Sequence, residues 1–330
     1  MRPPAPGRET IDPREYLSLG GEASVATALR DRTGYCIQRQ TLAALSEALE
    51  SGTPLLAEGK PGCGKSALAN AVAAAFNLPY FSLQSMDGIS LGDLLYEWDR
   101  AGQAVAGPEA RWTREYLMLG EILGAFEHAE RRGVCILRID EVDKLTERHQ
   151  HMLLQILEEG FSDVPRLVPT SRVGITTPGR AWPIVILTSN DRGDVISEPL
   201  RSRCTYTWIH NPTPVEEAEI LVSRCPQARP ELIYAAVRLL AFVRHKGDLR
   251  AKPGLREVIR LTRELARKGI KRITPDVVER HACHLVKNRN DLASLVAARA
   301  AVAVAAHREN QIVDEPVRRA IEGTARGHAA

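Results

Sequence analysis

A glycine-rich segment followed by Lys and Ser carries the residue types and spacing that most clearly predict chemistry. The segment "GKPGCGKS" (Gly59 to Ser66) matches the pattern G-x-x-x-x-G-K-[ST] in full. Glycines let a backbone wrap so that its N–H groups point at phosphate oxygens, and the N-terminus of a following helix adds positive potential. A strand-like run, "PLLAEG", leads into the segment, and an amphipathic run, "KSALANAVAAAF", begins at its last two residues, Lys65 and Ser66. The sequence therefore predicts a phosphate-binding loop between a strand and a helix.

This loop predicts the residues that hold a nucleotide and its metal ion. We expect Lys65 to reach the outer phosphates and the Ser66 hydroxyl to ligate Mg²⁺. ATP and Mg²⁺ are the expected cofactors. The expected nucleotide-binding residues of the loop are Gly59, Lys60, Pro61, Gly62, Cys63, Gly64, Lys65, Ser66 and Ala67.

A pair of carboxylates follows another buried strand. "VCILRIDEVDK" contains Asp140 and Glu141, and adjacent residues of an extended chain point to opposite sides. We therefore assign Asp140 to the Mg²⁺ shell and Glu141 to the polarisation of an attacking water. Arg138 interrupts the apolar run, and we expect it either to reach water at the end of the sheet or to pair with a carboxylate. The pair predicts a hydrolase that supplies its own base.

Two further segments offer polar side chains after strand-like runs. "WPIVILTSN" would deliver Asn190 beside the γ-phosphate, where its amide could orient the same water, although Asn is also common in turns. "EPLRSRC" places Arg201 and Arg203 in a stretch poor in apolar residues, where guanidinium groups gain little from packing. We therefore expect these arginines to meet a negative charge, in this chain or in another.

The composition is that of a globular protein with about two domains. The chain has 330 residues, is 44% hydrophobic and 26% charged, and has a net charge of +3. That charge is too small for the whole chain to attract nucleic acid. The six cysteines form no C-x-x-C pair, which fits a reducing compartment. We find no apolar signal region and no stretch suited to a bilayer, so we expect a soluble cytoplasmic protein.

Strands that alternate with helices over the first two thirds predict a parallel sheet covered on both faces. After residue 212 the pattern is helical throughout. We therefore predict an α/β fold with four segments. Residues 1–24 are expected to be disordered, 25–212 to form the α/β core, 213–307 to form a small all-helical lid domain, and 308–330 to form a loosely ordered tail.

The motifs resemble those of AAA+ ATPases, in the same order along the chain. "GKPGCGKS" and "ILRIDE" correspond to Walker A and Walker B, and "VILTSN" and "LRSRC" follow them. "LLYEWDR" and "TYTWIHNPTPVEEAEIL" are similar to stretches of the MoxR-type members, and the resemblance covers about residues 35–290. It implies a P-loop αβα sandwich with strand order 5-1-4-3-2, a helical lid, a hairpin within residues 164–179 and an insertion near residues 88–112.

The resemblance also implies roles for three arginines. Arg203 corresponds to an arginine finger that meets the ATP of a neighbouring subunit, and Arg201 becomes a helper or an interface contact. Arg256 corresponds to the sensor-2 arginine of the lid, although its spacing with nearby arginines also fits a solvated helix face. The implied partners are other copies of the chain in a ring, with a hexamer as the expected size, and a client protein such as one with a von Willebrand A domain.

Two alternatives to a remodelling ATPase remain open from the sequence. Residues 238–272 contain twelve basic residues against three acidic ones, which would suit a nucleic-acid-linked AAA+ ATPase such as a loader. We favour a solvated lid surface instead, because no nucleic-acid-binding motif accompanies the run. The second alternative is a nucleotide switch that barely turns over, and Glu141 and Asn190 argue against it.

Overall fold

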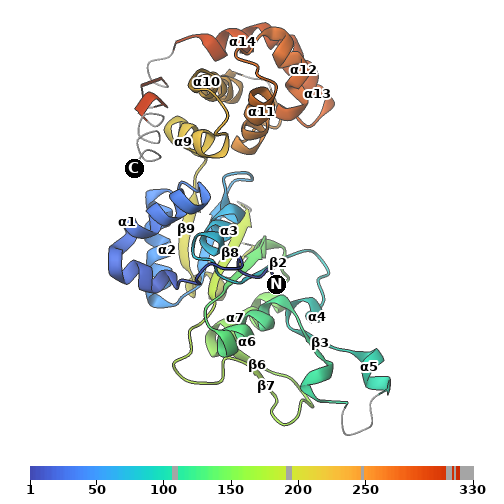
Figure 1. The fold of residues 1–330 in the computed structure, drawn as a ribbon. Helices are drawn as coiled ribbons and strands as arrows, with labels where there is room; N and C mark the ends of the chain where they lie inside the picture. The colour runs from blue at the N-terminus through green and yellow to red at the C-terminus, as the bar shows by residue number, and fades with distance from the viewer. Residues whose placement is uncertain (106–110, 191–194, 247–248, 310–313, 316, 320–330) are drawn as a thin grey trace. The chain divides into compact units, whose positions relative to one another are not determined.

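The computed structural model describes residues 1–105, 111–190, 195–246, 249–309, 314–315 and 317–319 (Figure 1). The chain divides into two compact units, Met1–Ile209 and His210–Ala330. Each unit has a hydrophobic core of its own. The first is an α/β unit and the second is helical, and they are described separately.

The first unit is built on a five-stranded parallel sheet with the order β2-β5-β8-β1-β9. When these five strands alone are numbered along the chain, the order reads 5-1-4-3-2 from the other edge, which confirms the predicted fold. The strands are β1 (Leu55–Gly59), β2 (Tyr80–Gln84), β5 (Ile136–Asp140), β8 (Ile184–Asn190) and β9 (Thr205–Ile209).

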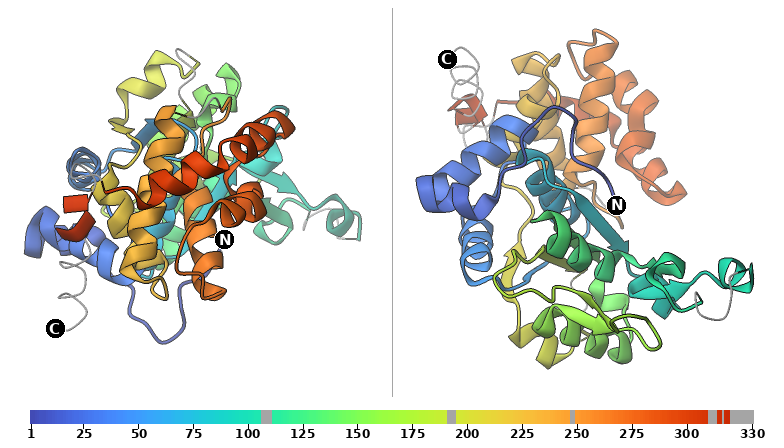
Figure 2. Two further views of the ribbon diagram at one scale, coloured as in Figure 1. Left: turned by 90° about the horizontal axis from the view of Figure 1, so that it is seen from above. Right: turned by 60° about the horizontal axis from the view of Figure 1, so that its bottom comes forward.

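Helices cover both faces of this sheet because the strands are apolar on both sides. Successive residues of β1 show the alternation: Leu55 and Ala57 pack with one group of helices, and Leu56 packs with the other. The first group is α1 (Pro13–Thr33), α2 (Arg39–Ser51) and α3 (Lys65–Ala75), and the second is α6 (Glu121–Arg132) and α7 (Glu147–Glu159). The two groups lie on opposite sides of the sheet (Figures 1 and 2).

Short elements extend the unit away from the sheet. Strands β3 and β4 form one antiparallel pair, and β6 and β7 form another. The second hairpin begins before Val164, so it lies partly outside the implied range. The elements are α4 (Leu91–Leu94), β3 (Tyr96–Trp98), α5 (Arg100–Val105), η1 (Arg114–Tyr116), β4 (Leu117–Leu119), η2 (Val142–Lys144), β6 (Phe161–Asp163), β7 (Arg172–Gly174) and α8 (Glu198–Ser202).

The structure differs from the expectation of disorder over residues 1–24. Helix α1 begins at Pro13, after an N-cap in which the Asp12 side chain accepts from the Arg14 N–H. Leu17 and Val25 are buried against α2 and α3, although Gly21 breaks the helical conformation between them. The sequence does not predict this helix, because its apolar residues are widely spaced and Gly21 divides it. Neither half shows a clear helical period of apolar residues by itself.

The second unit contains helices and, among its described residues, no strand. Thr213 caps α9 in a box completed by Glu216. Val317 is buried in the core, and Arg238 lies 2.6 Å from Asp314. Residues 310–313, 316 and 320–330 of the expected tail lie outside the described residues. The helices are α9 (Pro214–Arg224), α10 (Pro230–Lys246), α11 (Leu255–Arg267), α12 (Pro275–Leu285), α13 (Arg289–Ala297) and α14 (Arg299–His307).

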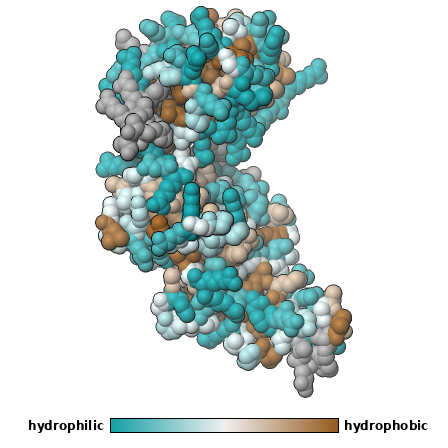
Figure 3. Space-filling model, in the orientation of Figure 1, coloured by the Kyte–Doolittle hydropathy of each residue, from teal (hydrophilic) through white to brown (hydrophobic). Residues whose placement is uncertain are grey.

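The face of the molecule that Figure 3 shows is mainly hydrophilic. In the view of Figure 3 the hydrophobic residues form separate patches among hydrophilic ones. Several exposed large apolar side chains come from the segment between β2 and α6, namely Met86, Leu91, Val105 and Met118. None of the helices in the described part of the chain is both long and apolar enough to cross a membrane.

Candidate nucleotide-binding site

The glycine-rich loop connects the carboxyl end of β1 to the first residue of α3. Gly64 caps α3 with φ of 109°, a conformation that L side chains rarely adopt. A Cβ on Gly59 would lie 2.4 Å from the carbonyl oxygen of Ile209, so a side chain has no room there. The glycines therefore allow both the turn and the close approach to β9 that bring the loop over the sheet.

Lys65 points back into this loop. Its side chain is buried, and Nζ donates to the carbonyl oxygens of Gly59 at 2.7 Å and Lys60 at 3.0 Å. The loop backbone thus holds the ammonium group beside the N-terminus of α3. This is where the phosphates of a nucleotide would need a positive charge.

Ser66 and Asp140 meet across the sheet, as the predicted metal site requires. Ser66 Oγ donates to Asp140 Oδ1 at 2.9 Å. The same carboxylate oxygen also accepts from the hydroxyl of Thr188, on the neighbouring strand β8. Mg²⁺ prefers oxygen ligands, and carboxylate is its usual protein ligand. The donor set therefore fits Mg²⁺ with Ser66 and Asp140 as its protein contacts.

Arg138 pairs with a carboxylate, which was one of the two outcomes expected for it. It lies two residues before Asp140, so both side chains are on the same face of β5. Its Nη2 donates to Ser82 Oγ at 2.8 Å and lies 3.6 Å from Asp140 Oδ2. Only 15% of the Arg138 side chain is exposed, so a guanidinium stands close behind the predicted metal ligand.

Glu141 leaves the strand in a left-handed conformation, with φ of 57° and ψ of 50°. This conformation is uncommon for a residue other than glycine and often occurs at functional sites. The Glu141 carboxylate meets Asn190, whose Nδ2 donates to Oε1 at 3.1 Å. Gln84 Nε2 at 2.8 Å and Lys144 Nζ at 2.5 Å contact Oε2. The predicted base and the predicted water-orienting amide are thus direct neighbours.

Three of these contacts come from residues that sequence reasoning missed. Gln84 ends β2 and pairs in register with Asp140, so a polar residue at the carboxyl end of a buried strand was an available signal. Thr188 precedes Asn190 by two positions in "ILTSN" and was an available signal for the same reason. Lys144 is three residues after Glu141, at a spacing that allows side chains on a helical turn to meet.

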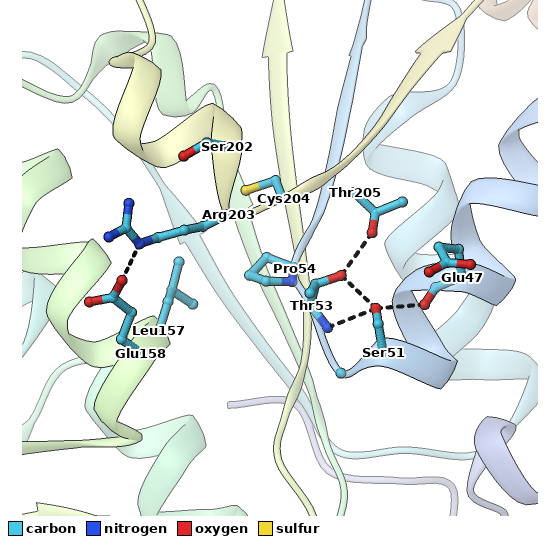
Figure 4. A pocket seen from close by; sticks show the side chains of 11 residues that line it. Glu47, Ser51, Thr53, Pro54, Leu157, Glu158, Ser202, Arg203, Cys204 and Thr205 are labelled. Atoms are coloured by element: carbon cyan, nitrogen blue, oxygen red, sulfur yellow. Dashed lines mark hydrogen bonds and ion pairs between the residues drawn. The ribbon is translucent and has the colours of Figure 1, made fainter.

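The two arginines after Asn190 have different partners within the first unit. Arg201 binds Glu58 through both terminal nitrogens, at 3.0 and 3.3 Å, and the Glu58 side chain is only 9% exposed. Arg203 forms an ion pair with Glu158 at the end of α7 (Figure 4). Its Nη1 also donates to the carbonyl oxygen of Pro199 at 3.0 Å. The Arg203 side chain is 41% exposed.

Arg203 also lies far along the sheet from the phosphate-binding loop of its own chain. It lines a cavity of about 360 Å³ whose other walls include Pro54, which precedes β1, and Thr205, which begins β9 (Figure 4). Those residues mark the amino ends of the two strands, whereas the loop follows the carboxyl end of β1. In a parallel sheet the amino ends of all strands lie at one end of the sheet, and the carboxyl ends lie at the other. Arg203 therefore lies at the end of the sheet opposite the phosphate-binding loop of its own chain.

Arg256 lies in the second unit, apart from the residues described so far. Its side chain is exposed in the first turn of α11. The next residue, Glu257, accepts a hydrogen bond at Oε2 from the Gly254 N–H at 3.0 Å. In the same unit several members of the basic run have acidic partners: Arg238 pairs with Asp314, Arg244 with Glu217, and Arg267 and Lys268 with Glu264. Part of the positive charge of the run is thus balanced inside the unit.

A glycine-rich loop after β1 and an acidic pair at the end of β5, which β8 separates from β1, are typical of a P-loop nucleoside triphosphatase. Residues 55–209 match the family model described as "ATPase family associated with various cellular activities (AAA)". These residues include every residue of the first unit named in the site above except Pro54. Residues 55–209 are therefore identified as an AAA ATPase domain.

Similar proteins include a yeast ATPase and a bacterial motor. The chain is 26% identical over 184 residues to the ribosome biogenesis ATPase RIX7 of Saccharomyces cerevisiae, a match that covers 56% of this chain and 19% of RIX7. The chain thus spans about a fifth of that relative. The Holliday junction branch migration motor RuvB of Thermotoga maritima has a TM-score of 0.43 and 18% identity, covering 77% of this chain and 72% of RuvB.

Proposed function

We propose that the chain is a Mg²⁺-dependent ATP hydrolase of the MoxR type that works in a ring and remodels a partner protein. The observation that carries the catalytic part is the placement of Glu141. Its carboxylate is held by the Asn190 amide, while the adjacent Asp140 faces the Ser66 hydroxyl. These contacts support a metal ion on one side of the strand end and a water molecule on the other.

Within the site, each side chain has a separate task. Lys65 would exchange its carbonyl acceptors for the oxygens of the β- and γ-phosphates. Ser66 and Asp140 would hold Mg²⁺, which neutralises charge on the phosphates when bound. Glu141 would accept the proton of the attacking water, and Asn190 would orient that water.

The resting contacts of Glu141 suggest how the base is kept ready. Its carboxylate accepts hydrogen bonds from Asn190, Gln84 and Lys144. A carboxylate has about four acceptor positions, so a water could join these donors or replace one of them before Glu141 acts as a base. Gln84 is exposed and comes from a separate strand, so its contact is the easiest to exchange.

Arg203 would complete the site of a neighbouring subunit, and Arg256 would contact the γ-phosphate from the lid. Two observations support a role of Arg203 as an arginine finger. Arg203 lies at the end of the sheet opposite its own phosphate-binding loop, and its side chain is partly exposed. Arg201 is better suited to a structural role, because Glu58 of the same chain already binds both of its terminal nitrogens.

The ring and the client rest on the class of ATPase. AAA+ ATPases form oligomeric rings, and the motifs around residues 94–100 and 205–221 resemble those of MoxR-type members, for which a hexamer is the expected size. The client would be a protein such as one with a von Willebrand A domain. The exposed apolar residues between β2 and α6 offer it a surface. The internally paired charges of the basic run favour this function over nucleic-acid loading.

Steady-state hydrolysis by Glu141→Gln tests the catalytic proposal. Loss of a general base typically costs about 10²–10⁴-fold in rate, and we expect a loss in that range with binding of a fluorescent ATP analogue retained. Glu147→Gln is the matched control, because Glu147 is a highly exposed carboxylate six residues further on. Equal rates for the wild type and Glu141→Gln would contradict the assignment. The Glu141→Gln protein, loaded with ATP, also provides a trap for isolating the client.

A further inference from the structure

The arginine inside the Walker B strand has no role in the function proposed so far. Arg138 is the only basic residue of β5, whose other residues before Asp140 are Ile136, Leu137 and Ile139. Its side chain is 15% exposed. A largely buried charge is costly unless other groups compensate it. The groups that compensate Arg138 therefore indicate what the residue does.

The guanidinium of Arg138 has few partners besides Asp140. Its Nη2 donates to Ser82 Oγ, and the guanidinium carbon lies 5.8 Å from the centre of the Tyr80 ring. Its Nε is buried and has no hydrogen-bond partner among the described residues. The carboxylate of Asp140, with Oδ2 3.6 Å from Nη2, is the one negative charge recorded within ion-pair distance of Arg138 in the described chain.

The two oxygens of Asp140 are consequently divided between different surroundings. Oδ1 faces the hydroxyls of Ser66 and Thr188, on the side where the metal would bind. Oδ2 faces Arg138. The strand register fixes this division, because Ser82 lies opposite Arg138 in the sheet and accepts a hydrogen bond from its guanidinium.

We propose that Arg138 is a positioning residue that sets the divalent-cation affinity of the site. Its guanidinium forms an ion pair with Oδ2, 3.6 Å from Nη2, so Asp140 would meet a cation through Oδ1 with a fixed positive charge behind that ligand. The inference rests on the proposed function, which assigns Asp140 to the metal. Cation affinity depends on the number and charge of the ligands, so a paired carboxylate binds a divalent cation more weakly than an unpaired one. Repulsion between the guanidinium and the cation acts in the same direction.

Removing the positive charge should therefore strengthen cation binding. The probe is Mn²⁺, measured by the loss of its free electron paramagnetic resonance signal in the presence of protein with saturating ADP, with ADP alone as the blank. This readout does not depend on hydrolysis. For Arg138→Gln, which keeps hydrogen-bond donors but no charge, we expect the Mn²⁺ dissociation constant to fall about five-fold or more. Arg138→Lys keeps the charge and should stay within about two-fold of the wild type.

Arg14 supplies a matched control at the other end of the sheet. Its Nη1 lies 3.6 Å from Asp12 Oδ2, the same separation as in the Arg138 pair, and its Nη2 donates to the carbonyl oxygen of Trp182. Arg14→Gln should therefore leave Mn²⁺ binding unchanged. Unchanged or weaker binding by a folded Arg138→Gln protein would overturn the inference. Arg138→Met serves as a second neutral variant if Arg138→Gln does not fold.

Asp140→Asn separates failure of this inference from failure of the proposed function. If Asp140→Asn loses Mn²⁺ binding and Arg138→Gln binds as the wild type does, only the role of Arg138 is contradicted. If Asp140→Asn itself binds Mn²⁺ as the wild type does, the metal assignment of the proposed function is contradicted, and the inference fails with it.

Discussion

Replacing Arg201 should damage the stability of the α/β unit, whereas replacing Arg203 should damage catalysis. The two arginines are only two positions apart, but their surroundings differ. Arg201 binds the nearly buried Glu58 through two nitrogens, and its own side chain is 32% exposed. Arg203 shares a pair with Glu158 in which both side chains are 41% or more exposed.

The size of the effect follows from the charge that each substitution leaves behind. Breaking a buried ion pair by removing one partner costs about 3–5 kcal/mol, because the other charge remains buried and unpaired. The partial exposure of Arg201 lets water reach the pair, so we expect Arg201→Ala to lower the free energy of unfolding by about 2–3 kcal/mol. For a domain of this size each kcal/mol lowers the melting temperature by about 2–4 °C. The expected shift is therefore roughly 5–10 °C.

Calorimetry and steady-state ATP hydrolysis, performed on the same variants, measure both effects. Arg203→Ala should lower the melting temperature only slightly, because an exposed ion pair contributes about 1 kcal/mol or less. Adding Glu58→Gln to Arg201→Ala should recover part of the lost stability, since no unpaired buried carboxylate then remains. The reasoning is refuted if Arg201→Ala melts with the wild type and yet loses hydrolysis. That result would make Arg201 a catalytic helper.

Two further predictions concern ion pairs whose carboxylates can be neutralised. Glu158→Gln removes the exposed ion pair of Arg203, which is worth about 0.4–1 kcal/mol. The protomer concentration that gives half-maximal ATP hydrolysis should therefore fall about two- to five-fold. The control Glu159→Gln, at an exposed neighbouring position, should leave this concentration unchanged. Burial raises the pKa of Glu217, beside Arg244, to about 7. A carboxyl whose pKa is raised by folding binds its proton more tightly in the folded state than in the unfolded state. The helical unit should therefore lose stability as the pH rises from about 5 to 7. Glu217→Gln should reduce this pH dependence in calorimetric melts.

Much of the fold could be predicted because its determinants are local. Each central strand is an apolar run with a polar end, and the glycine-rich loop identifies β1 as the strand before the phosphate site. The order of the strands came from the family resemblance, and the sheet confirms it. Helix α1 was missed because Leu17 and Val25 gain their meaning only from packing against α2 and α3, which no local pattern encodes.

The site shows the same division between local and distant information. The loop residues and the Asp140–Glu141 pair could be assigned because spacing in the sequence fixes their positions. The contacts of Glu141 with Gln84, and of Arg201 with Glu58, join residues 57 and 143 positions apart. Such pairs depend on strand register and on the path of α8, so the sequence could predict that a charge meets Arg201 but not which one. The roles of all the site residues, from Lys65, Asp140 and Glu141 to Asn190, Arg203 and Arg256, stay predictions.

We propose that neighbouring subunits share the catalytic site, and mixing two inactive variants tests this sharing. Lys65→Ala removes the phosphate-binding ammonium, and Arg203→Ala removes the finger. If the site is shared, mixed rings contain interfaces that pair an intact phosphate-binding loop with an intact Arg203, so ATP hydrolysis should partly return on mixing. Rings shown to contain both variants, but with no more activity than either variant alone, would contradict the account.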